Sequence, residues 1–150
     1  MLLDVAVCLP HEAETVGLIR SVAKNALRLF GVTQDCVDDI SLALSEACTN
    51  VIDHAAPSDE YEVRLQIDEE SCIISVTNTG PGFDAGALDN VMPEPSSARG
   101  RGVAIMRSLM DQVDFRPEPE AGTIVHLVKT LSIDSDGVLA RLRRKRQPSQ

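Results

Sequence analysis

The sequence is poor in aromatic residues: it contains no Trp, one Tyr and three Phe among 150 residues. It also has no apolar run long enough to span a membrane, and no signal peptide is visible, because an acid follows the first three residues at once. The lack of a membrane-spanning run and of a signal peptide argues against a membrane protein or a secreted one, and we expect a cytoplasmic location. Hydrophobic residues still make up 43% of the chain, which suffices for the core of one globular domain.

The spacing of the cysteines and histidines along the chain argues against disulfide bonds and metal binding. The cysteines lie far apart in apolar segments and form no Cys-x-x-Cys pair, and the three histidines show no metal-ligand spacing. This pattern argues against a disulfide framework and against a zinc site. It predicts four buried, reduced thiols, at Cys8, Cys36, Cys48 and Cys72.

The charge of the chain is unevenly distributed. The net charge is −9, but residues 140–150 hold five basic residues and no acidic one, so the remainder carries −14. An acidic body repels nucleic acid and favours basic protein partners, so we expect no direct nucleic-acid contact. Residues 133–150 are assigned to a basic C-terminal tail, either a short helix or a disordered end. Because no core periodicity reaches residues 140–150, we expect their deletion to leave folding intact.

The most informative segment is a helix predicted over Asp35 to Ala55. Its apolar residues recur at three- and four-residue steps and form one stripe. Glu46, Asn50 and Asp53 fall on the opposite side, where an ordinary surface helix carries Lys, Arg and Glu. An acid and an amide one turn apart can act on a phosphate. The alternative is a solvated face that contains one weak helix former.

A first glycine cluster, Gly80 and Gly82, follows a strand predicted over Cys72 to Thr77. Glycines there permit positive φ or a close approach of backbone to a ligand, although such a segment taken alone is usually a turn. Asn78 lies where the strand stops, so its side chain can point into a cleft.

A second cluster, Arg99 to Gly102, opens an apolar segment that begins at Val103. Glycines at a helix start expose free N–H groups at the positive end of the helix dipole, and arginines add charge-assisted contacts to phosphate oxygens. A Gly-Thr pair at residues 122–123 follows. The order of these elements along the chain is a much stronger signal than any one of them.

Together these four segments resemble the N, G1 and G2 boxes and the final Gly-Thr of the GHKL ATPases, the histidine-kinase, gyrase and MutL superfamily. Within it, the stretches Ser45 to Ala55 and Ile105 to Val113 are most similar to the serine-kinase anti-sigma factors of bacteria. The resemblance runs from about Leu2 to Leu131. It implies a Bergerat-type fold, with ATP held between helices and residues 85–101 acting as a lid.

Periodicity along the chain independently predicts an α/β fold. Because helices and strands do not alternate strictly, we expect a two-layer α/β sandwich with a mixed sheet and helices on one face. Residues 1–132 form the predicted histidine-kinase-like ATPase domain, and residues 85–97 a mobile loop. The expected helices are 12–30, 35–55 and 103–109, and the expected strands are 2–9, 61–67, 72–77, 111–115 and 123–130.

The resemblance also implies roles for individual residues. Glu46 is the catalytic general base for the attacking hydroxyl, and Asn50 binds Mg²⁺. Asp53 and His54 occupy positions that flank the nucleotide in the family, although we expect His54 only to pack at the helix end. Arg99 or Arg101 meets the γ-phosphate, and Thr123 lies near the adenine. The predicted nucleotide-binding residues are Asn50, Asp53, Asn78, Gly80, Gly82, Arg99, Gly100, Arg101, Gly102, Val103 and Thr123.

One position departs from the family pattern: Asn78 stands where the family usually has Asp. The family Asp accepts a hydrogen bond from the 6-amino group of adenine. Asn can accept the same bond through its oxygen and donate to the ring nitrogen, so adenine remains a suitable base. Loss of the charge weakens the nucleotide site by about 1 kcal/mol or more, or lets it accept a different base.

Three functions follow from these observations. The first is an anti-sigma factor, a cytoplasmic homodimer in a stress response, that sequesters a sigma factor and phosphorylates an anti-anti-sigma antagonist as an ATP-dependent serine kinase. The second is a binding-only partner-switching module with a weakened or lost nucleotide site, which Asn78 favours. The third, the ATPase domain of a sensor histidine kinase, is disfavoured because no helical segment with a phospho-acceptor His precedes the domain. Intact Glu46 and Asn50 favour the first.

Overall fold

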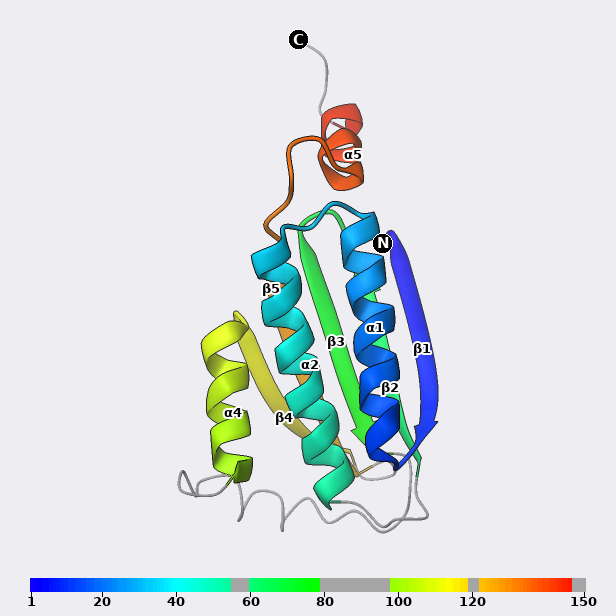
Figure 1. The fold of residues 1–150 in the computed structure, drawn as a ribbon, viewed down its shortest axis with the longest axis vertical. Helices are drawn as coiled ribbons and strands as arrows, with labels where there is room; N and C mark the ends of the chain where they lie inside the picture. The colour runs from blue at the N-terminus through cyan, green and yellow to red at the C-terminus, as the bar shows by residue number, and fades with distance from the viewer. Residues whose placement is uncertain (55–59, 79–97, 119–121, 147–150) are drawn as a thin grey trace.

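The computed structural model describes residues 1–54, 60–78, 98–118 and 122–146. They form a five-stranded sheet in the order β1-β2-β3-β5-β4, and α1, α2 and α4 cover one face of it (Figure 1). The strands are β1 (Leu3–Pro10), β2 (Glu60–Ile67), β3 (Ser71–Asn78), β4 (Gln112–Glu118) and β5 (Gly122–Thr130). The helices are α1 (Ala13–Leu29), α2 (Gln34–His54), α4 (Ala98–Leu109) and α5 (Val138–Arg146).

The predicted two-layer α/β sandwich is confirmed, but the expectation of a mixed sheet is wrong. All four strand pairs, β1–β2, β2–β3, β3–β5 and β4–β5, are antiparallel. The connection between β1 and β2 contains two helices, α1 and α2, and not one. A single crossover helix returns the chain for a parallel strand, whereas an antiparallel pair of helices leaves it ready for an antiparallel one.

The core lies between the sheet and the helices. Strand β3 alternates strictly between half-buried and buried residues, as expected for a strand with one face against helices. Helix α2 contributes a continuous buried stripe that includes Val37, Ile40, Leu44, Cys48 and Val51. This stripe is the one that the periodicity predicts, so the opposite side of α2 faces away from the sheet.

Gly31 ends the region of α1, as predicted, and it has a positive φ of 82°. A Cβ placed on Gly31 would lie 2.7 Å from the Cα of Gly137, far inside ordinary contact. The turn between α1 and α2 therefore touches the segment that leads into α5. Glycine is required here both for the backbone angle and for this close approach.

The basic tail is a helix, α5, in the described part of residues 133–150. Leu139 is fully buried and Ala140 nearly so. Of the two alternatives for this tail, the short helix is the one that forms. Sequence periodicity over so short a helix gives no signal, and the effect of deleting residues 140–150 stays a prediction. The division of the chain at residue 132 stays a prediction.

The cysteine prediction holds at three positions of four. Cys36, Cys48 and Cys72 are buried, and burial raises the pKa of the Cys48 and Cys72 thiols to about 12. Cys8 is exposed, because β1 is an edge strand and Cys8 lies on the sheet face opposite the helices. Within the described ranges, no helix is long and apolar enough to cross a membrane.

Candidate functional site

A pocket of about 320 Å³ lies between α2 and α4 and brings together residues that the sequence analysis singled out. It occurs where the C-terminal half of α2 faces the N-terminal part of α4, at the end of the molecule opposite α5 (Figure 1). Its lining consists of Glu46, Thr49, Asn50, Asp53, Arg101, Gly102 and Ile105. Five of these seven residues were predicted as site residues.

Helix α2 positions the acid and the amide differently. Asn50 is 4% exposed, whereas Glu46 is half-buried and Asp53 is exposed. Asn is a poor helix former, and a buried one within a helix needs a partner for its amide. The pocket supplies a place for that amide, while the Glu46 side chain stays partly accessible to solvent.

Gly102 of α4 is essential to the shape of this pocket. A Cβ added to Gly102 would lie 2.7 Å from Oε2 of Glu46 and 3.9 Å from Oδ1 of Asn50. The acid and the amide therefore reach the same small volume beside the α4 backbone. Any larger residue at position 102 would occupy the space that the Glu46 carboxylate now takes.

Helix α4 begins at Ala98, so the predicted start at Val103 is wrong. Only the first four N–H groups of a helix lack an intrahelical acceptor, so Gly102 lies beyond them. Its contribution is close approach to Glu46 and not a free amide. The helix still begins beside the pocket, and its positive end favours an anion there. Arg101 lines the pocket and is exposed.

Asn78 is fully buried at the end of β3 and does not line this pocket. Its neighbour across the sheet is Tyr61, which is also fully buried. The hydroxyl of Tyr61 lies 2.6 Å from Oγ1 of Thr15 on α1, and burial raises the pKa of that phenol. Asn78 therefore lies on the buried, helix-facing side of the sheet, beside Tyr61 in the strand register.

Of the remaining predicted residues, some lie outside the described ranges and others are described only as part of a helix or strand. Gly80, Gly82 and the predicted lid up to residue 97 lie outside the described residues. Arg99 and Gly100 lie in α4 and Thr123 in β5, next to Pro117 of β4, but their side chains are outside the description, as is that of His54. Val103 is buried in the core and does not line the pocket.

Thr49 and Ile105 line the pocket but were not predicted. A signal for both was available in the sequence. Thr49 follows Glu46 by three residues and Ile105 follows Gly102 by three, so each lies on the same helical face as a predicted residue. Sequence reasoning overlooked them because a threonine and an isoleucine suggest no chemistry of their own.

A second cavity, of about 390 Å³, adjoins the first across α2. It lies between α1 and α2 and shares Thr49 and Asp53 with the α2–α4 pocket. We call it the α1–α2 groove. Its other lining residues are Ala13, Glu14, Val16, Gly17, Arg20 and Ile52.

Metal binding at the α2–α4 pocket would have to involve few protein ligands. Across the residues that the structure describes, no group of three or more His, Cys, Asp or Glu side chains could hold a metal ion. The buried oxygen of Asn50 is a ligand type that suits Mg²⁺, an ion that usually takes one or two protein ligands and completes its shell with water and phosphate oxygens. The donor set therefore fits a Mg²⁺–nucleotide better than a free metal.

Comparison with known proteins agrees with this geometry. The family described as "Histidine kinase-like ATPase domain" matches residues 9–129. A serine-protein kinase RsbW from Bacillus licheniformis is 33% identical over 82% of this chain and 82% of its own length. The RsbW of Bacillus subtilis is 31% identical with the same coverage, and that of Halalkalibacterium halodurans is 29% identical over 91% of this chain and 92% of its own.

Solved structures show the same fold. The RsbU and RsbW domains of a Mycobacterium tuberculosis protein align with a TM-score of 0.66 at 18% identity, covering 88% of this chain and 33% of that one. The histidine kinase domain of a blue-light activated kinase from Erythrobacter litoralis aligns with a TM-score of 0.51 at 18% identity, covering 87% and 64%. The chain belongs to the histidine kinase-like ATPase family and, within it, to the RsbW serine-protein kinases.

Proposed function

We propose that this protein is an anti-sigma factor that binds a sigma factor and, as an ATP-dependent serine kinase, phosphorylates an anti-anti-sigma antagonist. The observation that carries the proposal is the α2–α4 pocket, in which Glu46 and Asn50 reach the same volume beside Gly102. Relatives named serine-protein kinase RsbW at 31–33% identity support the same activity. A cytoplasmic location and the absence of a direct nucleic-acid partner are part of the proposal.

In this proposal Glu46 accepts the proton of the attacking serine hydroxyl. The hydroxyl oxygen bonds to the γ-phosphorus, the bond between that phosphorus and the β–γ bridging oxygen breaks, and ADP leaves. Phosphoryl transfer depends mainly on positioning and charge stabilisation, so the general base contributes only part of the rate enhancement. The half-buried position of Glu46 suits this role, since the carboxylate faces a pocket and still reaches water.

Asn50 and Arg101 would hold the phosphates. The Asn50 oxygen is the protein ligand we assign to Mg²⁺, which when bound neutralises charge on the phosphate oxygens. Arg101 and the positive end of α4 add attraction for the same oxygens. The assignments of Arg99, Gly100, Thr123, Gly80 and Gly82 to nucleotide binding rest on the family resemblance alone.

The α1–α2 groove is where we place the approach of the protein substrate. It adjoins the pocket through Thr49 and Asp53, so a segment lying in it would end beside Glu46. The groove has an apolar part, Val16 and Ile52, and its charged lining residues are one base, Arg20, and two acids, Glu14 and Asp53. By its place on α1, Arg20 is similar to an arginine that contacts a partner in the family, and we assign it to the sigma-factor surface.

A homodimer is also part of the proposal. In the described part of the chain, α1, α2 and α4 all lie on one face of the sheet (Figure 1). The opposite face carries the half-buried apolar residues Ile73, Val128 and Ile124; Ile73 pairs with Val128, and Ile124 lies further along β5, opposite Thr77. A second copy packed on this face would bury them, and sedimentation analysis of wild type and Ile73→Arg would test that arrangement.

Calorimetric titration with ATP tests the nucleotide site. Wild type should bind ATP, with tighter binding when Mg²⁺ is present, and Asn50→Ala should lose the Mg²⁺-dependent part of the affinity. The alternative, a binding-only partner-switching module, is favoured by the neutral Asn78 in place of the family Asp. Absence of binding heat and of a thermal shift at millimolar nucleotide, with or without Mg²⁺, would establish that alternative and refute the kinase proposal.

A further inference from the structure

The segment after β5 contacts two turns at one end of the molecule: the turn between α1 and α2 and the turn between β2 and β3. We call residues 132–146, which include α5, the strap. Three backbone hydrogen bonds join it to the turn between α1 and α2: Thr33 N–H to Ser132 O at 2.8 Å, Asp134 N–H to Gly31 O at 2.7 Å, and Leu139 N–H to Phe30 O at 2.9 Å. The strap is therefore attached to the helix layer at several points.

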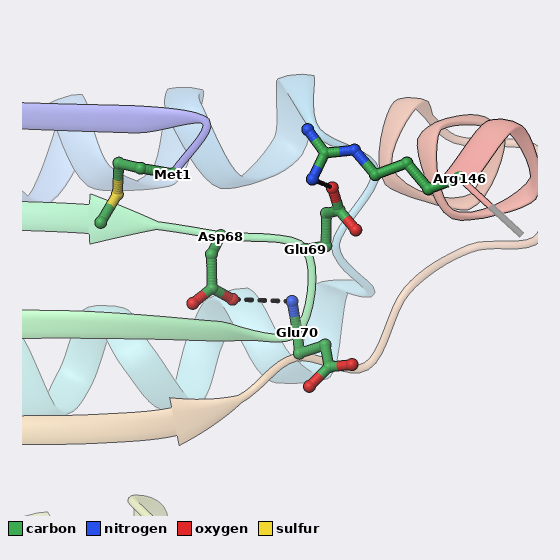
Figure 2. A pocket seen from close by; sticks show the side chains of 5 residues that line it. All are labelled: Met1, Asp68, Glu69, Glu70 and Arg146. Atoms are coloured by element: carbon green, nitrogen blue, oxygen red, sulfur yellow. Dashed lines mark hydrogen bonds and ion pairs between the residues drawn. The ribbon is translucent and has the colours of Figure 1, made fainter.

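The arginines of α5 attach the strap to the sheet layer at the turn between β2 and β3. Arg143 donates to the backbone carbonyl of Glu69 from Nε at 2.9 Å and from Nη2 at 2.6 Å. Arg146 forms an ion pair with the Glu69 carboxylate. Figure 2 shows this pair beside Met1, Asp68 and Glu70, which line a cavity of about 230 Å³ with them.

Of the other basic residues of α5, two form hydrogen bonds within the strap and, in the described part of the chain, one forms none. Arg141 donates to Asp136 O at 3.4 Å and Arg144 to Ser135 O at 3.1 Å, so both bind within the strap. Lys145 is exposed and makes no such contact within the described ranges. Most of the basic run thus has an intramolecular explanation: it holds the helix in place.

The strap joins the body through a small apolar surface as well as through charge. Ile133 is half-buried against the core, Leu139 and Ala140 of α5 are buried, and the rest of that helix is exposed or half-exposed. With the two acids Asp134 and Asp136 counted against the five basic residues of α5, the strap carries +3, and the rest of the chain carries −12. Attraction of this kind weakens as salt shortens the screening length, from about 10 Å at about 0.1 M to about 3 Å at about 1 M. A segment with few buried apolar contacts also belongs to the less stable part of a fold.

We propose that the strap is a conditional element of the fold: it opens and closes as one unit while the sheet stays folded, and ionic strength sets how often it is open. The hydrogen bonds of Thr33, Asp134 and Leu139 all break when the strap leaves, so these three amides report on one event. This inference is independent of the kinase activity, because the strap lies at the opposite end of the molecule from the α2–α4 pocket (Figure 1).

Amide hydrogen exchange measured by NMR tests the proposal on the full chain. At about 0.1 M salt the amides of Thr33, Asp134 and Leu139 should exchange at a common rate that is faster than the rate of the central strand β3. Raising salt to about 1 M should accelerate all three together and leave β3 unchanged. The double variant Arg143→Ala/Arg146→Ala should accelerate them about tenfold or more, because hydrogen bonds to a charged group are strong enough for that factor, and should lose most of the salt effect.

Lys145→Ala is the matched control, since it removes one charge from the same helix without removing a contact. It should change the exchange of the same three amides much less than the double variant does. Exchange of the strap at the rate of β3 at both salt concentrations would overturn the proposal, because the strap would then be an integral part of the core. Three unrelated rates at Thr33, Asp134 and Leu139 would also overturn it, since they would indicate local fraying. The wild-type salt series decides between these outcomes even if the double variant fails to fold.

Discussion

Substitution of Gly102 by Ala should separate the stability of this protein from its activity. The new Cβ would lie 2.7 Å from Oε2 of Glu46, and ordinary contact begins at about 3.4 Å, so the carboxylate must retreat by about 0.7 Å. Glu46 is half-buried and can move, so the cost to folding is small. The gain from replacing a glycine inside a helix is about 0.5–1 kcal/mol. The free energy of unfolding should therefore stay level or rise slightly.

Phosphate transfer should fall at the same time. A displacement of a catalytic group by about 1 Å costs on the order of 10²-fold in rate, so we expect a loss of about 10- to 100-fold in kcat for Gly102→Ala. Urea unfolding and a single-turnover transfer assay on the same preparation measure the two quantities. Gly17→Ala serves as the reference for the helix-propensity gain, because nothing lies within 4 Å of the added methyl group. An unchanged transfer rate in Gly102→Ala would refute the placement of the base.

Three further predictions concern nucleotide recognition by Asn78, the burial of Leu139 in α5, and the dependence of stability on pH. Asn78→Asp should tighten ATP binding measured by calorimetry, since it restores the charge on the acceptor; weaker binding would show that adenine is not the base read there. Leu139→Ala should lower the free energy of unfolding in urea by about 2 kcal/mol, the low end for a buried leucine, whereas Leu29→Ala, on a side chain that is 70% exposed, should change it little. Burial, and then the Arg116 charge, lower the pKa of His126 below its usual value. Below about pH 6.5 the unfolded chain therefore binds a proton that the folded chain does not, so stability should fall as pH drops from about 7 toward the lowered pKa, and His126→Gln should flatten that fall in a urea series.

Local patterns in the sequence predicted the elements of this fold well. The stripe from Val37 to Val51 is the buried side of α2, and the strands predicted over residues 61–67 and 72–77 appear as β2 and β3. The direction of the strands could not be predicted in the same way. It depends on which strands become neighbours, and that is decided by the packing of α1 and α2 as a pair and not by any short segment.

The candidate site shows the same division between local and non-local information. Glu46 and Asn50 could be predicted as site residues because they lie opposite the apolar stripe of their helix, where a side chain is not needed for the core. That Gly102 would lie beside both of them could not be known, because it depends on the packing of α4 against α2. The docking of α5 was missed for a related reason: its anchors are one leucine and several arginines, a composition that is equally typical of a solvated tail.

Transfer of radiolabelled phosphate from ATP to a serine of a candidate antagonist protein tests the central claim most directly. Wild type should transfer phosphate, and Glu46→Ala should be slower by about 10²–10⁴-fold while still binding the sigma factor in a pull-down. Asp35→Ala removes an exposed acid from the first turn of the same helix, outside the pocket, and should transfer at the wild-type rate. Equal transfer by wild type and Glu46→Ala would contradict the assignment of the base, and sigma binding without transfer by wild type would contradict the kinase function itself.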